Sequence, residues 1–121
     1  MKTALIIEDN PDILENTTEI LMLAGFRVIT ANDGKAGVSS AISGKPDVIL
    51  CDIMIPEMNG YEVMNTLKTN PLTAKIPFIY VTASAEKSEM LKALEMGADG
   101  YVRKPFDVDD LMQAIHKILP S

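Results

Sequence analysis

The sequence is short of several residue types, and each shortage excludes a class of protein. It has one cysteine, Cys51, so an internal disulfide is impossible. Lys and Arg number 11 against 17 Asp and Glu, which gives a net charge of −6. An acidic domain is repelled by the phosphate backbone of nucleic acids. We therefore expect no direct nucleic-acid binding by this domain.

Long apolar runs are also missing. The longest, such as residues 4–7 and 48–51, are far too short to cross a bilayer, so we expect no membrane association through a spanning helix. The N-terminus lacks the apolar core and the small-residue cleavage site of a signal peptide. Together with the single cysteine, these absences favour a cytoplasmic location.

The chain does have an ordinary apolar fraction, 47 % of 121 residues, which is enough to build one core. We therefore expect a single domain over residues 1–121. Met1 stands just before the first apolar run, which favours a natural N-terminus. Continuation of a longer protein beyond Ser121 is left open.

Short apolar runs alternate with stretches of helical spacing along the whole chain. The runs predicted to be strands are residues 4–7, 26–30, 48–51, 77–82 and 100–102. The stretches between them have apolar residues on one helical face, and most begin at a residue that can cap a helix: Asn10, Asp33, Asn59, Ser84 and Asp107. Their expected ends are Gly25, Gly44, Asn70, Gly97 and the C-terminus. The alternation predicts an α/β fold, a doubly wound parallel sheet with helices on both faces.

Polar side chains follow four of these strands. Glu8 and Asp9 follow the first strand, Asp52 follows the third, Thr82 ends the fourth, and Lys104 lies just after the fifth. Open α/β sheets bind ligands at the carboxyl ends of their strands, and in the strand order 2-1-3-4-5 these four strands are neighbours. Three carboxylates, a hydroxyl and an ammonium group are therefore predicted to converge in one pocket.

The first of these strands is not followed by a phosphate-binding turn. The glycine-rich dinucleotide fingerprint and the Walker P-loop are both absent, and Glu8-Asp9-Asn10 offers carboxylates where a flavin-phosphate loop needs glycines and hydroxyls. These acids would repel a phosphate unless a cation came between them. Because carboxylate oxygens suit hard divalent ions, we predict a Mg²⁺ site that receives a phosphoryl group, with Mn²⁺ as an alternative ion.

At this point the sequence resembles the response-regulator receiver domains of two-component signalling. The resemblance covers essentially the whole chain. It is carried by the acid pair Glu8-Asp9, the run from Pro46 through Asp52 to Gly60, the pair Thr82-Ala83, and the segment from Gly97 through Tyr101 to Phe106. The resemblance implies a flavodoxin-like (βα)5 three-layer sandwich with strand order 2-1-3-4-5.

The resemblance also implies a role for each site residue. Asp52 is expected to be the phosphoacceptor, a nucleophile that forms an acyl phosphate. The Mg²⁺ ligands implied are Glu8 (through water), Asp9, Asp52 and the backbone carbonyl of Met54. Lys104 is expected to pair with the phosphate, and its bond to Pro105 is usually cis in the family.

The remaining implications concern the output. Thr82 is expected to bond the phosphoryl oxygens, and Tyr101 to change rotamer as Thr82 moves. The partners implied are a sensor histidine kinase or phosphotransfer protein on one side and a downstream target on the other. That target would bind the face formed by the fourth helix, residues 100–102 and the last helix, and homodimerisation through this face is left open.

Three other functions compete with this one. An aspartyl-phosphate phosphatase of the haloacid dehalogenase type needs an acid two residues after the nucleophile, where this chain has Met54. A non-phosphorylated scaffold of the same fold would lack one of the key residues, and a plain metal-binding protein leaves Thr82 and Lys104 unexplained. We therefore expect a signalling switch that catalyses only its own phosphorylation and slow dephosphorylation. Cys51 and His116 are expected to be a core thiol and a surface histidine.

Overall fold

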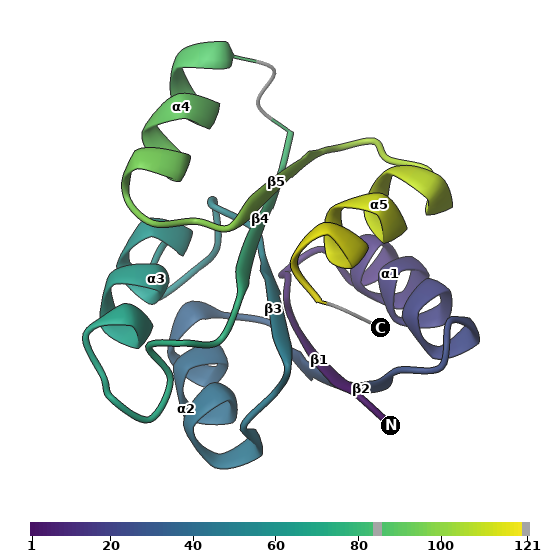
Figure 1. Ribbon diagram of the computed structural model, residues 1–121, viewed down its shortest axis with the longest axis horizontal. Helices are drawn as coiled ribbons and strands as arrows, with labels where there is room; N and C mark the ends of the chain where they lie inside the picture. Colours follow the sequence, from purple (N-terminus) through teal and green to yellow (C-terminus); the bar gives the residue numbers. More distant parts are fainter. Residues whose placement is uncertain (84–85, 120–121) are drawn as a thin grey trace.

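The computed structural model describes residues 1–83 and 86–119, which form a three-layer α/β sandwich (Figure 1). Within these residues, five strands alternate with five helices. The strands are β1 (Thr3–Ile7), β2 (Arg27–Ala31), β3 (Val48–Cys51), β4 (Phe78–Thr82) and β5 (Gly100–Arg103). The helices are α1 (Pro11–Leu23), α2 (Gly34–Gly44), α3 (Gly60–Lys68), α4 (Lys87–Glu95) and α5 (Val108–Ile118).

The strands form one parallel sheet in the order β2-β1-β3-β4-β5. Ile7 and Cys51, the last residues of β1 and β3, pair in register, and Cys51 pairs with Tyr80, two residues before the end of β4. The carboxyl ends of β1, β3 and β4 therefore meet at one edge of the sheet. The predicted fold class and strand order are confirmed.

Helices cover both faces of the sheet. Figure 1 shows α1 and α5 on one side and α2, α3 and α4 on the other. The first pair packs Leu21, Leu111 and Ile115 against the sheet, and the second group packs Ala41, Met64 and Ala93. Every residue of β3 and β4 is buried, as expected for continuous apolar strands between two helical layers.

Local capping chemistry sets most helix boundaries. The side chains of Asn10, Asp33, Asn59 and Asp107 each accept a backbone N–H of the first helical turn, as predicted. The predicted cap of α4, Ser84, lies outside the described residues, and the residue that precedes α4 is Glu86. The bounds of β3 match the prediction, those of the other strands differ from it by at most one residue, and α3 ends at Lys68, before the predicted Asn70.

The burial of two single residues and the lengths of the helices were also predicted. Cys51 is fully buried and His116 is exposed, as predicted. No helix among residues 1–83 and 86–119 is both long enough and apolar enough to span a bilayer.

Candidate functional site

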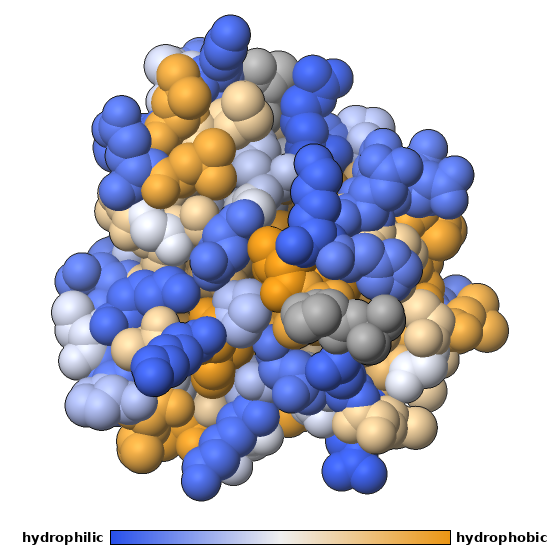
Figure 2. All heavy atoms as spheres, in the orientation of Figure 1, coloured by the Kyte–Doolittle hydropathy of each residue, from blue (hydrophilic) through white to orange (hydrophobic). Residues whose placement is uncertain are grey.

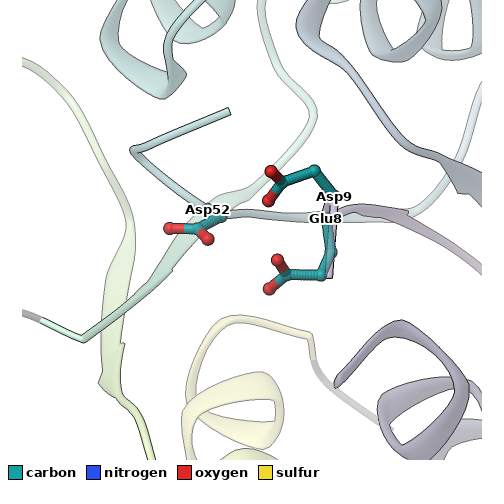
Figure 3. A group of neighbouring side chains, drawn as sticks. All are labelled: Glu8, Asp9 and Asp52. Atoms are coloured by element: carbon teal, nitrogen blue, oxygen red, sulfur yellow. The ribbon is translucent and has the colours of Figure 1, made fainter. Parts of the chain in front are cut away.

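The acidic cluster lies at the carboxyl ends of β1 and β3. Backbone bonds extend the ladder past both strands: the Glu8 N–H donates to the Ala31 carbonyl at 3.0 Å, and the Asp52 N–H donates to the Ile7 carbonyl at 3.0 Å. Figure 3 shows the Glu8 and Asp9 carboxylates extending from the end of β1 toward Asp52. One carboxylate oxygen from each acid lies within 4.8 Å of the other two. The three acids that the sequence predicts to converge are therefore together.

Lys104 reaches this cluster from the end of β5. Its backbone N–H donates to the Thr82 carbonyl at 2.7 Å, which holds the lysine beside the end of β4. Its Nζ donates to Oε1 of Glu8 and, at 2.9 Å, to Oδ2 of Asp52. The Lys104–Pro105 peptide bond is cis. The ammonium group thus bridges two of the three acids.

Burial changes the pKa values of Glu8 and Lys104. Glu8 is only 3 % exposed, and its second oxygen accepts the Asn10 N–H at 3.2 Å. Burial raises the pKa of Glu8, and the hydrogen bonds from Lys104 and Asn10 offset part of that rise. For Lys104, burial lowers the pKa, but the hydrogen bonds to Glu8 and Asp52 outweigh it and leave the pKa raised. Lys104 is therefore held in its charged form at neutral pH.

The loop after β3 packs tightly against the backbone of Asp52. The Gly60 N–H donates to the Ile53 carbonyl at 2.7 Å. A Cβ atom at Gly60 would lie 2.5 Å from the carbonyl oxygen of Asp52 and 2.7 Å from Cα of Ile53. Both of these atoms belong to the backbone and cannot move aside as a flexible side chain could, so no side chain fits at Gly60. The first residue of α3 therefore packs directly against the backbone of Asp52.

The donor set fits a divalent cation. Three carboxylates and one ammonium group leave a formal charge of −2 (three negative, one positive) among the side chains of Glu8, Asp9, Asp52 and Lys104. Oxygen donors of this kind suit Mg²⁺. Glu8, Asp9 and Asp52 are the residues that would hold it. The Met54 N–H donates to Oδ1 of Asp52 at 3.3 Å, and a ligand role for the Met54 carbonyl stays a prediction.

The other predicted site residues lie on the β4 and β5 side. Thr82 is 4 % exposed at the end of β4, and Tyr101 is half-buried on β5, where it pairs in register with Tyr80. Their roles in switching stay predictions. Met54, the residue at the position of a phosphatase general acid, has a side chain that is 78 % exposed.

Cys51 is adjacent in sequence to Asp52 but takes no part in nucleophilic chemistry. It is fully buried, and its thiol donates to the Asp52 carbonyl at 3.1 Å. Burial raises the pKa of the thiol well above its ordinary value, and the charges of Asp52 and Glu8 raise it further. The thiol therefore stays protonated and is not available as a nucleophile.

A family model and a curated relative both match nearly the whole chain. The family model for the response regulator receiver domain matches residues 4–116. The response regulator SaeR of Staphylococcus aureus is 37 % identical over 119 residues, which are 98 % of this chain and 51 % of SaeR. The chain therefore spans about half the length of the curated relatives it matches.

Solved structures share the fold over nearly the whole chain. A putative response regulator from Chloroflexus aurantiacus has a TM-score of 0.93 at 29 % identity, covering 99 % of this chain and 98 % of that one. The receiver domain of the sensor histidine kinase PA1611 from Pseudomonas aeruginosa, solved with a magnesium ion coordinated in its active site cleft, has a TM-score of 0.91 at 28 % identity with the same coverage. The chain thus belongs to the response regulator receiver domain family of two-component signalling.

Proposed function

We propose that this domain is the phosphoacceptor of a His-Asp phosphorelay and that Asp52 receives the phosphoryl group. The observation that carries the proposal is the convergence of Glu8, Asp9, Asp52 and Lys104 at one edge of the sheet. The donor is the phosphohistidine of a sensor histidine kinase or phosphotransfer protein, or a small acyl phosphate. We place the reaction in the cytoplasm, where these donors are made.

The chemistry requires little beyond positioning and charge neutralisation. An oxygen of Asp52 attacks phosphorus, the P–N bond to histidine breaks, and its electron pair goes to the imidazole nitrogen, which takes up a proton. A bound Mg²⁺ supplies positive charge that offsets the repulsion between the carboxylate and the phosphoryl oxygens. Support for this ion comes from the acidic cluster and from the magnesium in the PA1611 receiver domain. Lys104, 2.9 Å from Oδ2 of Asp52, is placed to neutralise a second share of the charge.

The domain is proposed to be a switch and not an enzyme that turns over external substrates. Turnover of phosphate esters needs a general acid beside the nucleophile. The residue two positions after Asp52 is Met54, whose thioether moves no proton. Self-phosphorylation and slow hydrolysis of the acyl phosphate are the reactions that this residue set supports.

Two surface pockets suit the proposed partners, a kinase or phosphotransfer protein and a downstream target. One of about 360 Å³ borders the site and has Ile13, Ala83, Pro105 and Phe106 in its lining, which suits an apolar helix of a kinase or phosphotransfer protein. Another of about 450 Å³ lies between β5 and α5 on the proposed α4-β5-α5 output face. Its lining includes Tyr101, the proposed switch residue. A downstream target that binds this face would sense the rotamer of Tyr101.

The test of the proposal is an intact-mass measurement of the purified domain. Incubation with acetyl phosphate and Mg²⁺ is expected to add the mass of one phosphoryl group, and peptide mapping is expected to place it on Asp52. Addition of a chelator before the phosphodonor is expected to prevent the increment. A domain that gains no mass, or that gains it at another residue, contradicts the proposal.

Replacement of Thr82 by Ala is expected to separate phosphorylation from switching. The variant keeps Asp52, Lys104 and the metal-binding acids, so the phosphorylated fraction should stay within about threefold of wild type. Without the hydroxyl, the phosphoryl oxygens lose the donor that pulls β4 toward them, so the amide shifts of Tyr101 and α4 on phosphorylation should shrink. Thr82→Ser, which keeps the hydroxyl, is the matched control. Equal shifts in wild type and Thr82→Ala would remove Thr82 from the switch.

A further inference from the structure

Helix α4 is the most weakly packed helix of the sandwich. Of its nine residues, all of which the structure describes, Ala93 is the one that is buried. Leu91 and Leu94 are 48 % and 41 % exposed, and Figure 2 shows apolar side chains among polar ones on the outer face over α4, at the upper left. An isolated helix of this length is marginal in water, so contacts with neighbouring elements determine where it lies.

One such contact joins α4 to α3. The Nζ atom of Lys92 lies 5.2 Å from the centre of the Tyr61 ring, within the range of a cation–π interaction. Glu89, one helical turn before Lys92, is also near this ring: burial raises the pKa of the Tyr61 phenol, and the charge of Glu89 raises it further. Tyr61 therefore presents a neutral ring to two charged residues of α4.

The Tyr61 ring is itself held from the sheet. Tyr80, fully buried on β4, contacts it edge-to-face with the ring centres 5.4 Å apart. The hydroxyl of Tyr80 donates to the Gly60 carbonyl at 3.2 Å. Gly60 packs without space for a side chain against the backbone of Asp52. The ring that Lys92 contacts is thus anchored to the loop that carries the proposed phosphoacceptor.

We propose that Tyr61 and Lys92 form a latch that holds α4 against α3, and that the strength of this latch sets how far α4 moves when Asp52 is phosphorylated. The first half stands on the contacts alone, and the second half rests on the proposed function. A change at Lys92 keeps all the side chains of the acidic cluster and Lys104, because Lys92 is an exposed residue of α4 and is not one of them. Loss of the latch acts on α4 alone. It lowers the free-energy cost of displacing α4 and therefore shifts the population toward the displaced state.

The first half is tested without any phosphodonor, by amide hydrogen exchange of the ¹⁵N-labelled domain. Lys92→Met keeps an apolar stem but removes the cation, and α4 amides should then exchange about two- to fivefold faster, the loss expected for one exposed cation–π contact. Lys92→Arg and Tyr61→Phe keep a cation and a ring face, and their α4 amides should exchange at nearly the wild-type rate. Lys87→Met, with the same charge change in the same helix, is the matched control. A wild-type rate in Lys92→Met, or an equal acceleration in Lys87→Met, overturns the latch.

The second half is tested by adding acetyl phosphate and Mg²⁺ to wild type and Lys92→Met at matched phosphorylated fractions. The α4 resonances of the variant should move further toward the phosphorylated position than those of wild type. Equal displacement at equal phosphorylation overturns the second half alone. If neither protein takes up phosphate, the proposed function and this second half fail together, while the hydrogen-exchange result on the latch stands.

Discussion

The Asp52→Asn variant is expected to gain no phosphoryl mass under conditions in which the wild-type domain is phosphorylated. The amide is neutral and a poor nucleophile, so no acyl phosphate forms at this position. Its size and shape match the carboxylate, and its single oxygen can still accept one of the two hydrogen bonds that Oδ1 and Oδ2 of Asp52 accept, from the Met54 N–H and from Lys104. Loss of phosphorylation in a folded protein is therefore the expected result, and intact mass together with circular dichroism measures both parts.

A second measurement on this variant separates the nucleophile from the metal site. Mg²⁺ is expected to stabilise the wild-type domain by binding its folded state, so the thermal midpoint should rise with the ion and rise less in Asp52→Asn, which lacks one anionic donor. The control is Asp47→Asn, an exposed acid at the other end of β3 whose carboxylate accepts the Thr3 N–H at 2.7 Å. It should match wild type in both measurements. Phosphorylation of Asp52→Asn at the wild-type level would exclude Asp52 as the acceptor.

The fold was predictable because its signals are local. The caps at Asn10, Asn59 and Asp107 involve residues within three positions of each other, and the buried strands appear as short apolar runs. Each of these features depends on the chain near one point, and the strand alternation then allows few topologies. Helix α4 was less predictable because only one of its nine residues, Ala93, is buried, and its predicted cap, Ser84, lies outside the described residues.

The residues that form the site could be predicted from the sequence, but the contacts between their side chains could not. Strand ends place Glu8, Asp9, Asp52 and Lys104 at one edge, and the structure brings their side chains together. The sequence does not show that Lys104 bridges Glu8 and Asp52, because a lysine side chain has several rotatable bonds and its partner depends on the other charges in space.

The chain of contacts from Gly60 through Tyr80 and Tyr61 to Lys92 was not predicted at all. It joins residues on three elements, and Gly60 entered the prediction only as the last residue of the run from Pro46 that carries the resemblance. The Tyr80 hydroxyl reaches the Gly60 carbonyl across 20 positions of sequence. No local pattern signals such a contact, since it depends on how α3 and β4 pack.

Replacement of Lys104 by Met is expected to change phosphorylation and metal binding in opposite directions. The phosphorylation rate should fall by about 100-fold, because one positive charge that offsets the developing phosphoryl charge is lost. Mg²⁺ should bind more tightly, since the ammonium group and the ion compete for the same oxygens of Glu8 and Asp52. The rate is measured with acetyl phosphate at saturating Mg²⁺, and the affinity by calorimetric titration without phosphodonor.

The same variant should depend on Mg²⁺ for stability more than the wild type does. Without the ion, Glu8 loses its cationic partner while it stays buried, and breaking a buried pair in this way costs about 3 kcal/mol. With the ion, the acidic cluster regains a counter-charge, so the thermal midpoint should recover most of the loss. Lys117→Met, an exposed lysine on α5, is the control and should leave rate, affinity and midpoint unchanged. Weaker Mg²⁺ binding in Lys104→Met would mean that Lys104 helps to assemble the metal site instead of competing with the ion, and that the −2 charge of the cluster is not what recruits it.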